Sequence, residues 1–375
     1  MRRDRILCIL LVVFVLFMSS CGNKNQAIKE DIRNFIMEQE KLVHAKDVEA
    51  YIGTLSWESP EYVAEKKSWM RDIKSNDIQD FQMEIKDIDL HKDQAIVEVS
   101  QSYRLQDRVY QVQYPLRLVK ERGNWKDGDL KFEEMKTKHF IIKYFDSSKK
   151  YAEKIHDVCE TAYGNVQTRY GKGIEEPTII KLYKDKEMLR QSVKLSFGWQ
   201  FAGWYEYPES IKTTEFDETG HYQEILEHEL IHKLTIQQAK NNLPYWFAEG
   251  LAMYFSNFQN EPEVYSSKGY YISTYKDKWM TIDRLEELNL ETMEDEEEIQ
   301  NYYDGSGMIA KFMIDTYGED TVKKIVDALG AYEYLEGTGA EVDKISIQRF
   351  HEVIPKILGI TVSELDNAWE TYLKQ

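Results

Sequence analysis

Two histidines and a glutamate near the middle of the chain have the types and spacing of a metal-dependent catalytic site. His228 and His232 stand four residues apart in the segment His-Glu-Leu-Ile-His, and apolar residues at helical spacing surround them. Side chains at positions i and i+4 of a helix project from one face, so both imidazoles can bind the same ion. Glu229 follows His228 directly, and we expect it to lie close enough to take a proton from a metal-bound water.

A third candidate ligand stands downstream, in a second apolar helix. Residues 241–244, Asn-Asn-Leu-Pro, interrupt the helical pattern, and Pro244 suits the first position of a new helix. Glu249 is a lone carboxylate in the apolar run that follows. A buried carboxylate needs a cation or strong hydrogen bonds to stay charged, so we predict that Glu249 binds the ion. The alternative is a Glu249 that faces solvent. Gly250, with Ala248 and Ala252 two residues to either side, predicts close packing of the helix backbone here.

Two histidines and one glutamate leave the fourth position of a tetrahedral zinc ion open, which is typical of a catalytic rather than a structural site. Zinc lowers the pKa of a bound water to about 7. We therefore expect Glu229 to act as the general base, which removes the water's proton and returns it to the leaving amine. An inactive zinc-binding protein and a cell-surface binding module are the alternatives. The presence of Glu229 favours an enzyme.

These residues resemble a known group of enzymes. His-Glu-x-x-His at 228–232 and Pro-x-Trp-x-x-Glu-Gly-x-Ala at 244–252 are similar to the motifs of the gluzincin metallopeptidases, and closest to the peptidase MA-like domains of bacteria. The resemblance covers about residues 138 to 372. It implies a short sheet packed on helices, a cleft under the sheet's edge strand, zinc as the metal and a peptide or protein as substrate. The ligands carry over to His228, His232 and Glu249, and the base to Glu229.

The sequence also departs from this group. Sixteen residues separate His232 from Glu249, slightly fewer than in thermolysin-like enzymes and aminopeptidases. Met253 stands where thermolysin-like enzymes have an acidic residue, so the partner that orients a zinc-bound histidine must come from elsewhere. A Gly-x-Met-Glu-Asn segment of the aminopeptidase type is missing from the sequence. Recognition of a substrate N-terminus is therefore unsupported.

A developing oxyanion needs a hydrogen-bond donor in addition to zinc. The segment Tyr302-Tyr303 resembles the tyrosine-bearing segment of the family, and we prefer Tyr303 as the catalytic donor, with a packing role as the alternative. His221 would reach the cleft only if the first helix extends back to it, and we expect it to lie in a surface loop. Gly203-Trp204 is a candidate for the cleft's edge strand, to which an extended peptide could add; packing of Trp204 in the core is equally compatible with the sequence.

The N-terminus predicts export. Three arginines precede an apolar run at 6–18, which is too short to span a bilayer comfortably but suits the core of a signal peptide. The run ends in Met-Ser-Ser-Cys-Gly, which resembles a bacterial lipobox with Met18 in place of the usual leucine. The resemblance implies that residues 1–20 are removed, that Cys21 is lipidated and that the protein is anchored to the cell membrane on its extracytoplasmic side. A plain transmembrane anchor or an ordinary cleaved signal is the alternative.

Charge and cysteine content narrow the partners. The formal net charge is −18, and loss of residues 1–20, which carry three arginines and one aspartate, would bring it to about −20. Such a chain repels nucleic acid and anionic lipid surfaces, so we expect no nucleic-acid partner and attribute membrane attachment to the lipid. After processing, Cys159 is the one thiol that is neither removed nor lipidated. We predict that it is a buried small hydrophobe in a helix.

The patterns along the chain predict an α+β protein of two domains, at 21–135 and 138–375. In the first, a helix at 28–45 precedes alternating runs near 81–85, 95–99, 112–114 and 116–118, with Pro115 at a bulge or an edge. A helix followed by a curved antiparallel sheet that ends in Gly-x-Trp-Lys resembles the nuclear-transport-factor-two-like (cystatin-like) fold.

The second domain is expected to begin with a few strands and then to become mostly helical, as the gluzincin resemblance implies. Strands are predicted at 139–145, 178–183 and 202–205, with helices at 148–170 and 186–193 between them. From Tyr222 onward the pattern is mostly helical.

Overall fold

The computed structural model describes residues 25–174, 177–207, 210–256, 268–337 and 339–375. The predicted signal peptide and Cys21 lie outside the described residues. The α+β fold class is confirmed, since helices are combined with one antiparallel and one mixed sheet. The chain divides into two compact units, Met1–Lys131 and Phe132–Gln375. Among the described residues, none of the helices has the length and apolar character needed to cross a membrane.

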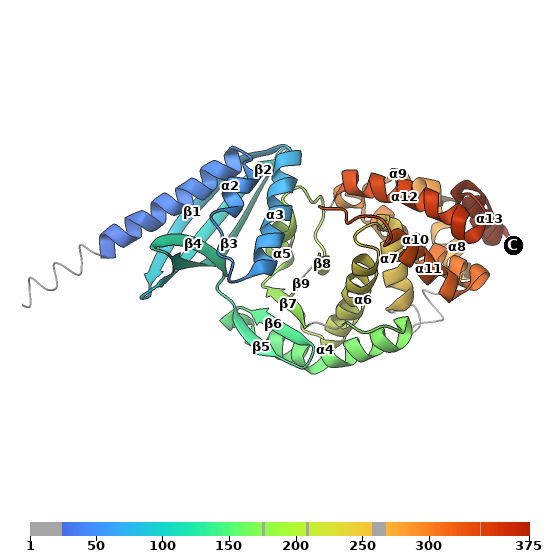
Figure 1. Ribbon diagram of the computed structural model, residues 1–375, viewed down its shortest axis with the longest axis horizontal. Helices are drawn as coiled ribbons and strands as arrows, with labels where there is room; N and C mark the ends of the chain where they lie inside the picture. The colour runs from blue at the N-terminus through green and yellow to red at the C-terminus, as the bar shows by residue number, and fades with distance from the viewer. Residues whose placement is uncertain (1–24, 175–176, 208–209, 257–267, 338) are drawn as a thin grey trace, which may run out of the picture. The chain divides into compact units, whose positions relative to one another are not determined.

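In the first unit, the helices come first along the chain and are followed by a four-stranded antiparallel sheet of order β1-β2-β3-β4 (Figure 1). A helix at 25–44 comes first, close to the predicted 28–45. The remaining elements are α2 (Val48–Ile52), α3 (Pro60–Ser75), β1 (Ile78–Leu90), β2 (Gln94–Leu105), β3 (Arg108–Glu121) and β4 (Asn124–Leu130). Alternate residues such as Val97 and Val99 on β2 are buried, as the period-two pattern predicts. The likeness to the cystatin-like fold stays a prediction.

Pro115 lies inside one long strand, where the sequence suggested two short runs. β3 continues through it and pairs with β2 from Arg108 to Val119. On the other side, the carbonyl of Pro115 accepts from the Lys131 N–H just beyond the end of β4, and the β3–β4 register shifts between Leu116 and Leu118. The proline therefore lies at the end of the β3–β4 ladder, where its missing N–H removes at most one hydrogen bond.

The second unit is built on a five-stranded sheet of order β5-β6-β7-β9-β8. Its strands are β5 (Glu133–Lys136), β6 (Phe140–Tyr144), β7 (Thr178–Tyr183), β8 (Gly203–Glu206) and β9 (Ser210–Thr214). The three central strands are parallel, and the two edge strands are antiparallel to their neighbours. Because β5 pairs with β6, the unit begins at Phe132, and the predicted boundary at 135–138 falls inside this hairpin. β9, Ser-Ile-Lys-Thr-Thr, was not predicted because it lacks an apolar alternation.

Helices make up the remainder of the second unit. The first four are α4 (Lys149–Tyr170), α5 (Lys186–Val193), α6 (Thr219–Gln238) and α7 (Tyr245–Phe255). They are followed by α8 (Lys268–Tyr275), α9 (Ile282–Glu287), α10 (Glu296–Tyr317), α11 (Glu319–Leu329), α12 (Ala340–Leu358) and α13 (Val362–Lys374). One continuous hydrophobic core joins the sheet to all of these helices except α5. Cys159 is fully buried within it on α4, as predicted, and burial raises the pKa of its thiol to about 11.

Candidate metal centre

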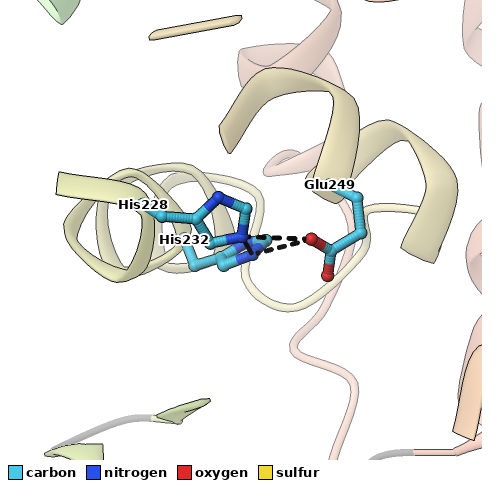
Figure 2. Close-up of side chains that lie close together, drawn as sticks. All are labelled: His228, His232 and Glu249. Carbon is cyan, nitrogen blue, oxygen red and sulfur yellow. Dashed lines mark hydrogen bonds and ion pairs between the residues drawn. The ribbon is translucent and has the colours of Figure 1, made fainter. Parts of the chain in front are cut away.

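The two ligand helices bring His228, His232 and Glu249 together. The histidines stand one turn apart on α6, and Glu249 projects from the middle of α7 toward them (Figure 2). The two Nε2 atoms are 3.1 Å apart, and the Glu249 Oε2 lies 3.2 Å from that of His228 and 3.3 Å from that of His232. Three donor atoms therefore converge on one point. Among the described residues, this is the group of histidine, cysteine and acidic side chains that could hold a metal ion.

The spacing of these donors fits a tetrahedral ion. Zinc binds imidazole nitrogen and carboxylate oxygen at about 2.0–2.1 Å, and a tetrahedral angle then separates neighbouring donors by about 3.3–3.4 Å. The observed sides of the donor triangle, 3.1 to 3.3 Å, are within a few tenths of an ångström of that value. The triangle needs almost no rearrangement to accept such an ion, and all three donor residues line the cleft described below.

Glu249 is directed into the site and not toward solvent. Its side chain is 15% exposed, against 20% for His228 and 8% for His232. Burial by itself raises the pKa of Glu249, but the charge of His232 and hydrogen bonds to both histidines outweigh burial and lower this pKa to about 2. The carboxylate is thus ionised over the whole physiological range, which a metal ligand requires.

Glu229 lies beside the donor triangle without belonging to it. Its side chain is buried, and burial, with the nearby charge of Glu249, raises its pKa to about 7, while His228 and a hydrogen bond from the Tyr205 backbone N–H oppose the increase. A Cβ atom on Gly203 would stand 2.6 Å from the Glu229 Oε1. The carboxylate is therefore held against the backbone of β8, and a side chain in place of Gly203 would have to displace it.

The edge strand predicted at Gly203-Trp204 is confirmed as β8. It pairs with β9 on one side and lies at the end of the sheet. Because Tyr205 donates its N–H to Glu229, this N–H points away from β9, and the alternation of a strand directs the backbone of Gly203 the same way. Both Gly203 and Trp204 line a cleft that also contains the donor triangle. The open side of β8 therefore faces the candidate metal centre.

The cleft combines the four acid–base and metal-binding side chains with a predominantly aromatic lining. Its residues are Phe197, Trp199, Phe201, Gly203, Trp204, Tyr205, Tyr207, His228, Glu229, His232, Ile236, Asn241, Tyr245, Ala248, Glu249, Leu290, Glu291 and Tyr303. Tyr303 is near the centre: its ring lies 6.4 Å from that of His228, and burial, together with the charges of Glu249 and Glu229, raises its pKa well above the ordinary value. The phenol thus keeps its proton.

The other candidates from the sequence do not line the cleft. Tyr302 is fully buried, adjacent to Tyr303 on α10 but outside the lining. His221 lies in the first turn of α6 and not in a loop, and its half-exposed side chain pairs with Glu218 and Glu224. Pro244 was predicted at the first position of the second ligand helix. It is instead the N-cap of α7, which begins one residue later.

Several residues that the sequence did not single out hold the ligand helices in place. The Asp343 Oδ1 on α12 accepts from the Tyr245 N–H, 2.8 Å away, and so caps α7 four residues before Glu249. Buried Glu227, one residue before His228, accepts from Arg169 and Asn165 of α4, each at 2.7 Å. Nothing in the sequence marks these partners, since they are 58 to 98 residues apart.

Close packing of α7 on α10 explains Gly250. A Cβ atom at this position would stand 2.5 Å from the Ser306 carbonyl oxygen and 3.1 Å from the Ala310 Cβ.

Met253, in place of an acidic residue, packs against the core. The Nδ1 of His232 is buried and, among the described residues, has no hydrogen-bond partner. We expected a residue elsewhere in the chain to orient this imidazole. Among the described residues, none bonds to its Nδ1.

Comparison with known proteins adds no assignment: no family model matches the chain, and no match is found among curated proteins. The functional argument therefore depends on the geometry of the site.

Proposed function

We propose that this protein is a zinc-dependent peptidase of the gluzincin type. The observation that carries the proposal is the triangle of His228, His232 and Glu249 donor atoms at tetrahedral spacing, with Glu229 beside it in the same cleft. Two imidazoles and one carboxylate form a donor set that zinc accepts in catalytic sites. When bound, zinc would polarise the substrate carbonyl and acidify a water molecule.

The chain's own residues would supply the proton transfers. Glu229 has its carboxylate at the donor triangle, on the side of β8, and is not needed as a ligand. In the proposed reaction it takes a proton from the attacking water and delivers it to the leaving amine, so that it is ionised again at the end of each turnover. The close approach of Gly203 and the hydrogen bond from the Tyr205 N–H hold this buried carboxylate in one place.

Two further elements would bind and stabilise the substrate. The open edge of β8 offers outward backbone groups at Gly203 to an extended peptide. Tyr303 keeps its proton and faces the same cleft, so its hydroxyl can donate to the oxyanion that develops on the substrate. A protein that binds zinc without hydrolysing peptides would need neither the base nor this donor.

The test is hydrolysis of a broad peptide library by the full chain after zinc loading, after removal of the metal with a chelator, and after zinc is restored. We expect about one zinc per chain, cleavage that is lost with the metal and regained with it, and pairs of products whose masses sum to that of the substrate plus one water. Zinc binding without any cleavage would favour the binding protein. Absence of zinc binding would overturn the proposal altogether.

A further inference from the structure

Four aromatic side chains form one wall of the cleft, and we call Phe197, Trp199, Phe201 and Trp204 the aromatic wall. Their rings contact one another: the Phe197 centroid lies 4.9 Å from that of Phe201 and 5.2 Å from that of Trp204, and the Phe201 and Trp199 centroids are 5.8 Å apart. Phe197 and Phe201 are buried, whereas Trp199 and Trp204 are partly exposed toward the cleft that all four line. The wall therefore presents large apolar surface to whatever occupies the cleft.

The aromatic wall extends to the metal centre. The Trp199 ring lies 6.4 Å from that of Tyr303, and Tyr303 lies the same distance from His228. Trp204 follows Gly203, whose backbone approaches the Glu229 carboxylate. A peptide bond placed at the donor triangle would thus have its neighbouring side chain within reach of the wall.

The segment that carries the wall is fixed in advance of any ligand. The buried guanidinium of Arg190 donates to the carbonyls of Leu195, at 3.2 Å, and Phe197, at 3.0 Å. The Trp199 indole N–H donates to the Leu290 carbonyl at 2.8 Å, and the Gly198 N–H donates to the Glu291 carbonyl at 3.0 Å. Because these bonds already order the segment, a bound side chain would meet a preformed surface at little cost in conformational entropy.

Glu291, a carboxylate that lines the same cleft as the wall, is already paired. Glu291 forms a buried ion pair with Lys194 and accepts a hydrogen bond from the Tyr245 hydroxyl at 2.7 Å. The Lys194 ammonium in turn lies 5.6 Å from the Phe197 ring. Glu291 therefore does not favour a basic substrate side chain, and the wall remains an apolar surface.

We propose that the aromatic wall selects peptides with an aromatic or large aliphatic side chain beside the bond that is cleaved. This inference rests on the proposed peptidase function and adds the class of substrate. A phenyl or leucyl group would lose its water-exposed surface against the wall, whereas alanine would gain little and a charged side chain would lose hydration without a partner.

Two readouts test the proposal. Peptides that differ only in one central residue, Phe, Leu, Ala, Lys or Asp, are titrated against the zinc-loaded full chain carrying Glu229→Gln, by fluorescence anisotropy of a label on the peptide. The same peptides are given to the wild type, with cleavage sites read by mass spectrometry. Burial of a side chain of this size predicts that Phe and Leu peptides bind about 10- to 100-fold more tightly than Ala, with a similar ratio in kcat/KM.

Substitutions in the aromatic wall test whether the wall causes the preference for Phe over Ala peptides. Trp204→Ala should reduce the Phe-to-Ala ratio about tenfold or more, because it removes the partly exposed indole that a phenyl group would contact. Phe201→Leu, which keeps an apolar side chain at a buried position, should reduce it less and guards against a folding defect. The matched control is Trp57→Ala, since Trp57 is 67% exposed in the first unit, and it should leave the ratio unchanged.

The outcomes separate this inference from the proposed function. Equal affinity for all peptides, a preference for Lys, or no measurable binding overturns the aromatic selection, even if the wild type hydrolyses peptides. Selective binding that depends on Trp204, without hydrolysis by the wild type, would support the selection and overturn the peptidase.

Discussion

Gly250→Ala tests whether the contact between α7 and α10 sets the position of Glu249. Alanine is the better helix former by about 1 kcal/mol, so propensity alone predicts a gain in stability. The new Cβ atom, however, would stand 2.5 Å from the Ser306 carbonyl oxygen, about 0.9 Å inside the 3.4 Å at which ordinary van der Waals contact begins. Backbone cannot rotate away as a side chain can, so α7 must move.

The expected magnitude follows from a matched control. Gly164 lies in the interior of α4, and a Cβ atom there has no heavy atom within 4 Å, so Gly164→Ala receives the propensity gain alone. Overpacking against a rigid neighbour costs about 1–3 kcal/mol, and this is the predicted difference between the two variants. In a unit of this size, the difference corresponds to roughly 2–10 °C in the midpoint temperature of thermal unfolding.

Gly250→Ala should also impair function. A shift of α7 by nearly 1 Å moves Glu249 relative to both histidines, and a displacement of that size can reduce turnover about 100-fold. Scanning calorimetry of both metal-free variants, zinc titration and peptide hydrolysis provide the data. If Gly250→Ala is as stable as Gly164→Ala and binds zinc like the wild type, the reasoning about this helix contact is wrong.

Three further predictions use single substitutions. Gly203→Ala places a methyl group against the Glu229 carboxylate, so turnover should fall about 100-fold while zinc stoichiometry is kept; metal analysis and kinetics on the same sample check this. Tyr303→Phe should lower kcat about 10²–10³-fold by loss of the oxyanion donor, whereas Tyr302→Phe, outside the cleft, should not; equal losses would contradict the assignment. Burial raises the pKa of Asp343 from 3.8 to about 7, so its charge destabilises the fold increasingly as pH rises from about 4 to 7, and Asp343→Asn should raise the melting temperature at pH 8 but not at pH 4.

The donor set could be predicted from the sequence because its members are local. His228 and His232 lie one helical turn apart, and Glu249 stands in a helix whose start is marked by Pro244. Spacing within a helix fixes which side chains share a face, so the convergence on one ion needs only that the two apolar helices pack. The structure brings the three donors together as this reasoning expects.

The elements that position these donors could not be predicted in the same way. β9 is fully buried yet consists of Ser, Ile, Lys, Thr and Thr, because its neighbours and not its own apolar pattern hold it in the sheet. The Asp343 cap and the Glu227–Arg169 pair depend on long-range contacts that leave no local pattern. The closeness of Gly203 to Glu229 likewise appears only once β8 has been placed at the sheet's edge.

The central claim is that Glu229 is a base at a zinc ion held by His228, His232 and Glu249. The most direct test is to measure zinc content and peptide turnover together for the wild type and Glu229→Gln. Because Gln keeps the size of the side chain and the ligand triangle is untouched, both proteins should contain about one zinc, and turnover should fall at least 10²–10⁴-fold in the variant. Wild-type turnover in Glu229→Gln, or loss of its zinc, would contradict the account.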